Sequence, residues 1–353
     1  MNFQELKIID LSTVLAGPSV GTFFAELGAE VIKIESPNIP DVTRSWKLPS
    51  ENSESEVSAY FSSVNYHKKY LKLDFTSSTD LEKLMKLLES TDILLSNFKT
   101  STEDRFGLNS ESLLKKFPKL IIGKVSGFGE ENDRIAYDLI LQAETGFMSM
   151  NGMPNSGPVK MPVALIDILA AHHLKEGLLI SLLERIKTKK GRKVSVSLYD
   201  AAISSLVNQA SNFLMEKHIP KRIGSLHPNI APYGEIFQTK DQFLVTFAIG
   251  SDLHFQKLAS LLSLSSLVND QRFSSNQNRV INRIELADIL QSEILKSDAQ
   301  TILDSCHKNF IPVARIKNLK EVFEDRDAQS LIREEEISGK STKRVTSIAF
   351  KWK

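Results

Sequence analysis

Cysteine is almost absent from this sequence of 353 residues. Cys306 is the single cysteine, so an intramolecular disulfide and a cysteine-based zinc site are both excluded. The seven histidines form no H-x-H or H-x-x-x-H pair, so the usual spacing of a histidine metal site is missing as well. We therefore expect no metal ion, and the lack of disulfides favours a cytoplasmic protein.

Long apolar runs and an excess of either charge are also missing. No stretch of about 18 uninterrupted apolar residues occurs, so we expect no membrane span. Lys and Arg total 44 and Asp and Glu total 43, for a formal net charge of +1. Proteins that bind nucleic acid usually carry a marked basic excess, so nucleic acid is not an expected partner. With 41% apolar and 25% charged residues, the composition is that of a globular protein of about two domains.

Strand and helix patterns alternate through residues 1–125. An apolar run at 6–11 is followed by helical spacing at 20–27 and by a second strand pattern at 31–34. This order within about 30 residues is typical of the βαβ unit of a parallel sheet. Two further strand patterns, at 92–95 and 120–125, extend the predicted sheet.

The rest of the chain predicts the end of this sheet and a second, smaller unit. A long helix is predicted at 167–186, a strictly alternating strand at 193–198 and another helix at 201–215. After a basic, turn-forming stretch, residues 233–320 combine one clear strand, at 243–248, with several helices. The predicted division is a large α/β domain at 1–198, a linker helix at 199–226, a small domain at 227–320 and a return segment toward the large domain at 321–353.

Residues at the ends of the predicted strands are the first candidates for ligand contact. The loop at 14–16 lies between a strand and a helix, where parallel sheets bind ligands and helix N-termini offer free N–H groups. Asn97 and Phe98 follow another strand, and Arg105 lies in the polar stretch beyond them. A guanidinium suits a phosphate and a phenyl ring can stack on another ring. The alternatives are that the loop at 14–16 is only a tight connection, that Phe98 is buried and that Arg105 is solvated.

Two aspartates occur beside apolar sequence. Asp138 precedes an apolar, helix-like run, where a helix N-cap is the simpler interpretation. Asp167 lies between the apolar runs at 164–166 and 168–171. A lone carboxylate in such a run has to be paired, hydrogen-bonded or used in chemistry, and an N-cap role is open here too.

Short motifs run through nearly the whole chain in a fixed order: LSTVLAGP at 11–18, LGAEVIKIE at 27–35, LKLDF at 71–75, SNF at 96–98, DRFGL at 104–108, SGFG at 126–129, YDLILQAETGFM at 137–148, a P-x-A-x-x-D-I stretch ending at 168, VSVSLYDAA at 194–202, HPNIAPYG at 227–234 and IPVARI at 311–316. Single matches of this length are weak, but their order and spacing together are specific. The chain thereby resembles the class III coenzyme A transferases, the family of carnitine-, formyl- and succinyl-CoA transferases and α-methylacyl-CoA racemases.

The resemblance implies a fold, an activity and a site. The implied fold is a large α/β domain with a Rossmann-like parallel sheet, a smaller α/β domain, and two chains interlocked like links in a homodimer. The implied activity is transfer of CoA from an acyl-CoA to a carboxylic acid, with no cofactor beyond CoA itself. Asp167 would be the nucleophile, carrying first the acyl group as a mixed anhydride and then CoA as a thioester. The residues that would contact CoA are Val14, Leu15, Ala16, Leu73, Asn97, Phe98, Arg105, Tyr137 and Asp138.

A carboxylate nucleophile suits this reaction because exchange of CoA between two acids has to keep the energy of the thioester. Each intermediate therefore has to remain activated and enclosed away from water. A serine ester would be too stable for the CoA thiolate to regain the thioester easily. An aspartate within apolar sequence fits a site that excludes water.

The racemases of the family are the alternative function, because they move an α-proton of an acyl-CoA with an acid and a base. In them a histidine precedes the aspartate at the place of Asp138. Here that residue is Tyr137, whose ordinary pKa of about 10 makes it a poor base at neutral pH, so we favour transfer. A non-catalytic CoA-binding protein is a further alternative, against which the retained Asp167 motif argues. Leu15 stands where oxalate-handling members carry glutamine, so we do not expect oxalate or formate as the substrate.

Overall fold

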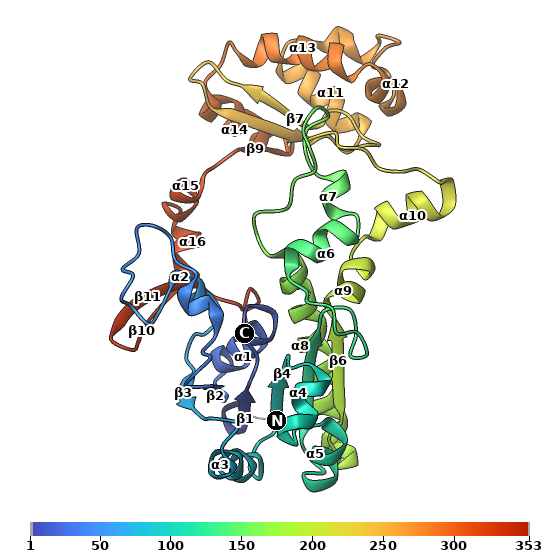
Figure 1. Cartoon of the computed structure of the whole chain (residues 1–353). Helices are drawn as coiled ribbons and strands as arrows, with labels where there is room; N and C mark the ends of the chain where they lie inside the picture. The colour runs from blue at the N-terminus through green and yellow to red at the C-terminus, as the bar shows by residue number, and fades with distance from the viewer. Residues whose placement is uncertain (1–2, 352–353) are drawn as a thin grey trace. The chain divides into compact units, whose positions relative to one another are not determined.

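The computed structural model describes residues 3–351, and these form two compact units (Figure 1). The first unit comprises residues 3–148, 160–219 and 330–351, and the second comprises residues 149–159 and 220–329. The chain therefore leaves the first unit twice and returns to it twice. The segment predicted as a linker, 199–226, and the predicted return segment, 321–353, are each divided between the two units.

Six short strands rich in Ile, Val and Leu form the parallel sheet of the first unit. They are β1 (Lys7–Asp10), β2 (Glu30–Glu35), β3 (Lys69–Lys72), β4 (Ile93–Ser96), β5 (Ile121–Ser126) and β6 (Lys193–Ser197). Their spatial order is β3-β2-β1-β4-β5-β6, and each neighbouring pair is parallel. The chain order reverses at the β1/β4 pair. In open α/β sheets, ligands bind outside the carboxyl ends of the strands at such a point.

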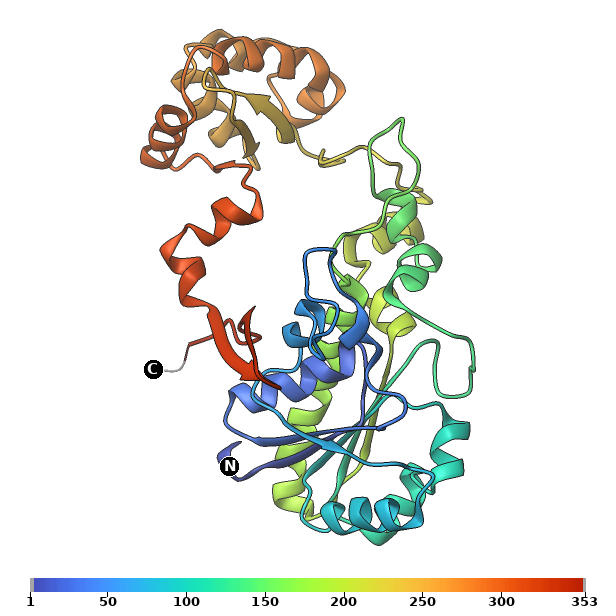
Figure 2. The ribbon, with the colours of Figure 1, turned by 60° about the vertical axis from the view of Figure 1, so that its left-hand side comes forward.

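Helices cover both faces of this sheet, because successive strand residues point to opposite sides. The helical segments are η1 (Phe3–Glu5), α1 (Ala16–Glu26), η2 (Val42–Ser45), α2 (Ala59–Ser63), α3 (Ser78–Leu88), α4 (Thr100–Phe106), α5 (Ser110–Lys116), α6 (Asp138–Glu144), α7 (Phe147–Met150), α8 (Leu165–Thr188), α9 (Leu198–Ser204) and α10 (Val207–Glu216). In β4, Ile93 and Leu95 join the apolar cluster of α1, α8 and α9. Leu94 joins the opposite cluster with α3, α4 and α5 (Figure 2). The predicted α/β class with a parallel sheet is confirmed.

Most of the predicted elements of the first unit are present, and the exceptions have physical reasons. The edge strand β3 escapes prediction because its sequence, KYLK, has two lysines and no buried side chain. The helix predicted at 201–215 is two helices, α9 and α10, with Ser205 and Leu206 between them. The predicted helix at 167–186 is confirmed as α8, which begins two residues earlier and ends two residues later.

The second unit is a small α/β body around an antiparallel sheet of three strands. The strands are β7 (Tyr233–Gln238), β8 (Leu244–Ala248) and β9 (Val313–Arg315), in the order β7-β8-β9. The helical segments around it are α11 (Asp252–Leu261), η3 (Ser265–Val268), α12 (Asn276–Ile281), α13 (Arg283–Ile294), α14 (Ala299–Lys308), α15 (Leu319–Phe323) and α16 (Arg326–Ser330). Phe237, Val245 and Phe247 of the sheet pack against buried Leu258 and Leu290 from the helices.

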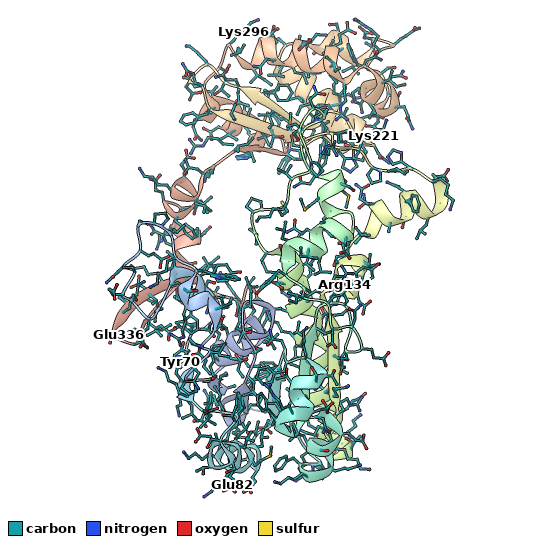
Figure 3. The ribbon with its side chains drawn as sticks, in the orientation of Figure 1. Tyr70, Glu82, Arg134, Lys221, Lys296 and Glu336 are labelled. Atoms are coloured by element: carbon teal, nitrogen blue, oxygen red, sulfur yellow. The ribbon has the colours of Figure 1, made fainter. Side chains whose placement is uncertain are left out.

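A C-terminal hairpin belongs to the first unit. Its strands are β10 (Ile332–Ile337) and β11 (Lys340–Val345), and Ile337 packs with Val57 and Phe61. Glu336 lies on the outward side of this hairpin and is exposed (Figure 3). Glu82 and Lys296, elsewhere on the chain, are exposed charged residues as well.

Within residues 3–351, no helix is long and apolar enough to cross a membrane. The same part of the chain has no group of three or more His, Cys, Asp or Glu side chains that could hold a metal ion.

Candidate active site

A buried ionic cluster holds the loop that follows β1. Asp10 accepts hydrogen bonds from the backbone N–H of Ser12 (3.0 Å) and from the Ser12 hydroxyl, and it pairs with Lys68 at 2.8 Å. Lys33 pairs with Asp41 at 3.0 Å and donates a hydrogen bond to the Ser12 carbonyl at 2.7 Å. These four charged side chains are completely shielded from solvent. Each charge has a partner of opposite sign inside the protein, so the cluster holds the loop that follows β1 in one conformation.

Val14, in this loop, has a strained backbone. Its φ is +72°, a value that β-branched residues rarely adopt, and strain of this kind concentrates at functional sites. The Val14 N–H lies 3.3 Å from each carboxylate oxygen of Asp41. Asn97, which follows β4, donates to the Thr13 carbonyl and accepts from the Thr13 N–H, both at 3.1 Å. The loop and Asn97 are thereby joined at the β1/β4 edge, immediately before α1 begins at Ala16.

Asp167 is the third residue of α8 and is only 7% exposed. No protein group of residues 3–351 donates a hydrogen bond to its carboxylate, and the N-cap of α8 is Ala164. Burial, and after it the negative charge of Asp138, raises the pKa of Asp167 to about 7. A carboxylate this basic and this free of hydrogen bonds is suited to attack a carbonyl carbon.

Two cavities meet at Asp167. Val14, Leu15, Tyr137 and Asp167 line both of them. The first, of about 260 Å³, also includes Ala16, Asn97, Phe98 and the loop that follows β5. The second, of about 530 Å³, extends over the start of α6 and the segment before α8. Cavities of a few hundred Å³ are of the size that binds small molecules.

Arg105 lines a third cavity, of about 420 Å³. This cavity shares Thr13 and Phe98 with the first, so the three cavities follow one another in a row. The Arg105 side chain is exposed, lies 4.6 Å from the centre of the Phe106 ring and forms no ion pair within residues 3–351. The Phe98 ring is partly buried, with its edge toward Phe75 at 5.9 Å. The row thus extends from a guanidinium available to a phosphate as far as Asp167.

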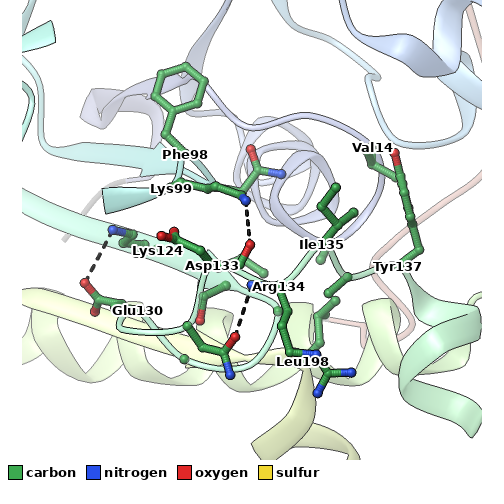
Figure 4. A pocket seen from close by; sticks show the side chains of 18 of the residues that line it. Val14, Phe98, Lys99, Lys124, Glu130, Asp133, Arg134, Ile135, Tyr137 and Leu198 are labelled. Carbon is green, nitrogen blue, oxygen red and sulfur yellow. Dashed lines mark hydrogen bonds and ion pairs between the residues drawn. The ribbon is translucent and has the colours of Figure 1, made fainter. Parts of the chain in front are cut away.

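The loop between β5 and α6 borders the first cavity with charged side chains that the sequence analysis did not identify (Figure 4). Lys124, on β5, lies 3.4 Å from the Glu130 carboxylate and 2.6 Å from that of Glu103. Lys99 donates to the Asp133 carbonyl at 2.6 Å. These cations already have protein partners, so their first effect is to hold the loop in place. The signal for them was the SGFG motif directly after a predicted strand.

Aromatic side chains of the second cavity were also missed. The ring of Trp46 lies 5.1 Å from that of Tyr60 and 6.2 Å from that of Tyr137. Burial, followed by the charges of Asp167 and other carboxylates, raises the pKa of Tyr60 to about 12, so its hydroxyl stays protonated. Trp46 is an exposed tryptophan within a polar stretch, and such a residue is a signal for ligand contact.

Two of the predicted CoA contacts, Leu73 and Asp138, are buried among protein groups. Leu73 is 2% exposed in the core cluster around Leu84 and lines none of the three cavities. Asp138 lines the second cavity but is 8% exposed, and both of its oxygens accept hydrogen bonds from protein groups. It is also the first residue of α6 and not its N-cap, which is Tyr137. As CoA contacts, Leu73 and Asp138 stay predictions.

Known proteins match this chain along nearly its whole length. The family model described as CoA-transferase family III matches residues 3–353. The chain is 33% identical over 331 residues to succinate–glutarate CoA-transferase of Agrobacterium fabrum, covering 92% of this chain and 82% of that protein. It is 33% identical over 323 residues to acetyl-CoA:oxalate CoA-transferase of Acetobacter aceti, covering 90% and 82%. A solved structure, a CAIB/BAIF family protein from Brucella suis, matches with a TM-score of 0.84 and 34% identity over 98% of this chain and 91% of that one. The chain belongs to CoA-transferase family III.

Proposed function

We propose that this protein moves CoA from an acyl-CoA to an acceptor carboxylate, with Asp167 as the covalent carrier. The observation that carries the proposal is the position of Asp167, which is buried, receives no hydrogen bond from residues 3–351 and lies where two cavities meet. Membership of the family and the names of its relatives support transfer as the reaction.

The proposed reaction begins when a carboxylate oxygen of Asp167 attacks the carbonyl carbon of the acyl-CoA. The C–S bond breaks, CoA leaves as a thiolate and Asp167 holds the acyl group as a mixed anhydride. The thiolate then attacks the aspartyl carbonyl and releases the first acid as its carboxylate, which leaves an aspartyl-CoA thioester. An acceptor carboxylate repeats the two steps in reverse and restores the Asp167 carboxylate. No proton is gained or lost in the exchange.

An acyl-CoA would occupy the three cavities in turn. Arg105 in the third cavity would bind a phosphate of the nucleotide portion, and the chain leading to the sulfur would occupy the first cavity. The thioester would then lie at Asp167, with the acyl group in the second cavity beside Trp46 and Tyr60. Apolar and aromatic walls there would exclude the water that hydrolyses an activated acyl group.

The acid is proposed to be a dicarboxylate. Succinate and glutarate, which the name of the Agrobacterium fabrum relative contains, each carry two carboxylates. Lys160 lines the second cavity, donates to the carbonyls of Met161 (3.1 Å) and Pro162 (3.4 Å), and has no carboxylate partner within residues 3–351. Its ammonium would attract the carboxylate at the far end of such an acid while the near one reacts with Asp167.

A panel of acyl-CoAs and free acids tests the function. We expect new acyl-CoAs, detected by mass spectrometry, only when both a donor and an acceptor acid are present. Exchange should require Asp167, and Asp167→Asn should abolish it because an amide does not attack the thioester. Rapid deuterium exchange at the α-carbon of 2-methylacyl-CoA in heavy water, with no need of an acceptor, would show the racemase reaction instead.

A further inference from the structure

A pair of buried polar side chains on α6 holds the segment that leads into Asp167. The Asp138 carboxylate accepts a hydrogen bond from the Ile166 N–H at 2.7 Å and another from the Gln142 side-chain amide at 2.6 Å. The Gln142 carbonyl oxygen in turn accepts from the Met161 N–H at 2.8 Å. Asp138 and Gln142 are 8% and 1% exposed, so the three hydrogen bonds are shielded from competing water.

These contacts matter because the other hydrogen bonds of the segment at 161–163 come from its immediate neighbours in the chain, Lys160 and Leu165. Met161, Pro162 and Val163 are all exposed. Gln142 holds the segment at Met161, and Asp138 holds it at Ile166, next to Asp167. The pair therefore restrains both ends of a short connection whose movement would displace the first turn of α8.

We infer that Asp138 is a positioning residue for Asp167, acting with Gln142 to fix the start of α8 and placing a negative charge near the nucleophile. The inference rests on the proposed function, since it assigns the pair a task in carrying the acyl group and CoA on Asp167.

The charge has a direct chemical consequence. An ionised Asp167 is repelled by Asp138, whereas an acylated or thioesterified Asp167 is neutral and feels no such repulsion. Attack on the acyl-CoA moves the negative charge from the Asp167 oxygen to the departing CoA sulfur, away from the Asp138 carboxylate. Asp138 thus disfavours the free carboxylate relative to both covalent intermediates. Burial and the Asp138 charge also raise the pKa of Asp167, because both favour the neutral form of its side chain.

Other titratable groups lie around the two cavities at Asp167. Tyr60, Tyr137 and Lys160 line the second cavity, on elements other than α8. The charged groups of the first cavity are Lys99, Lys124, Glu130, Asp133 and Arg134. Among these groups and Asp138, only Asp138 has a charge that contributes to the raised pKa of Asp167. Its replacement is therefore the most direct way to alter the titration of Asp167.

The test uses the full-length protein without CoA. With aspartate labelled by ¹³C at the side-chain carboxyl, NMR identifies the Asp167 signal as the one lost in Asp167→Asn. We expect Asp138→Asn to lower the midpoint of this signal by about one pH unit. Glu82→Gln, at an exposed position on α3 that forms no ion pair within residues 3–351, serves as the control and should leave the midpoint unchanged. An unchanged midpoint in a folded Asp138→Asn variant would overturn the electrostatic part of the inference.

Amide hydrogen exchange tests the positioning part and does not depend on Asp138→Asn being stable. Gln142→Met removes the acceptor for the Met161 N–H and the donor to Asp138, so the amides of Met161 and Ile166 should exchange at least about tenfold faster than in the wild type. Unchanged exchange in this segment would refute the positioning role. Both readouts are independent of catalysis, so a wild-type protein that fails to exchange CoA would contradict the proposed function and leave these two results interpretable.

Discussion

Asp167 stands where its own negative charge is disfavoured. The side chain is buried, no group of residues 3–351 donates a hydrogen bond to it, and Asp138 adds a like charge nearby. An isolated carboxylate in such surroundings lowers the stability of the folded state, which is acceptable only where the group has a task. On the proposed function, the reactivity of this side chain comes at the expense of stability.

This conflict predicts that Asp167→Asn is more stable than the wild type at alkaline pH. Because the folded-state pKa of about 7 exceeds that of an unfolded aspartate, the folded state binds more protons between about pH 4 and 7. The contribution of Asp167 to the free energy of unfolding therefore falls as the pH rises through this range. We expect a gain of about 2–4 kcal/mol for Asp167→Asn at pH 8 and little gain at pH 4, measured by urea unfolding. A control at the exposed Asp104, Asp104→Asn, should show no such pH dependence, and equal gains at both pH values would contradict the account.

Lys160 gives a prediction about the acid. Lys160→Met should raise the KM for succinate or glutarate about tenfold, because one charge-assisted contact to the distal carboxylate is lost. The KM for a monocarboxylate of similar length, such as butyrate, should change little. Lys187→Met, at the exposed C-terminal end of α8, is the matched control. Equal effects on both kinds of acid would remove the dicarboxylate proposal.

At the scale of elements, the sequence predicts what local patterns determine. Apolar runs identify β1, β2, β4 and β5, and an alternating pattern identifies β6. The order of these strands implies that the loop at 14–16 and Asn97 meet at one edge. The contacts that complete the site are not local. Trp46 and Tyr60 reach the second cavity from a polar excursion, and Lys160 reaches it from the connection before α8. The pattern of hydrophobic residues contains no information about these tertiary contacts, so only the family motifs pointed to the region.

The C-terminal hairpin is another element that the sequence did not predict, because β10 and β11 are dominated by charged residues. Its attachment depends on Glu26 of α1, which is 2.6 Å from Arg344 and accepts hydrogen bonds from Thr346 and Ser347. The side chains of Glu26 and Arg344 are both 4% exposed.

We expect Glu26→Ala to lower the free energy of unfolding of the first unit by about 3 kcal/mol, since it leaves the Arg344 charge buried without its partner. Urea unfolding measures this loss. The exposed pair of Lys343 and Glu334 on the same hairpin offers a control, and Glu334→Ala should cost less than about 1 kcal/mol. Similar losses in the two variants would show that the Glu26 contact does not anchor the hairpin.

At the scale of the whole molecule, each excursion of the chain from the first unit is followed by a return, and the segment at 330–351 completes the second return. The family resemblance implies two such chains interlocked as a homodimer. In the first unit, Val207, Leu214 and Met215 of α10 are exposed, and apolar surface of this kind is usually covered by another protein surface.

We therefore expect light scattering to give a mass twice the 39.5 kDa of one chain at micromolar concentration. Leu214→Glu combined with Met215→Glu should shift the protein toward the monomer, because charges at a buried interface are costly. A wild-type mass of 39.5 kDa would contradict the dimer.

Direct capture of the covalent intermediate tests the central claim, that Asp167 carries the acyl group and CoA. The wild-type protein is incubated with succinyl-CoA alone and quenched with hydroxylamine, which converts an aspartyl anhydride or thioester into a hydroxamate. Peptide mass spectrometry should then locate the hydroxamate at Asp167, and neither Asp167→Asn nor the wild type without succinyl-CoA should contain it. CoA exchange between acids by a wild-type protein that shows no hydroxamate at Asp167 would contradict the account.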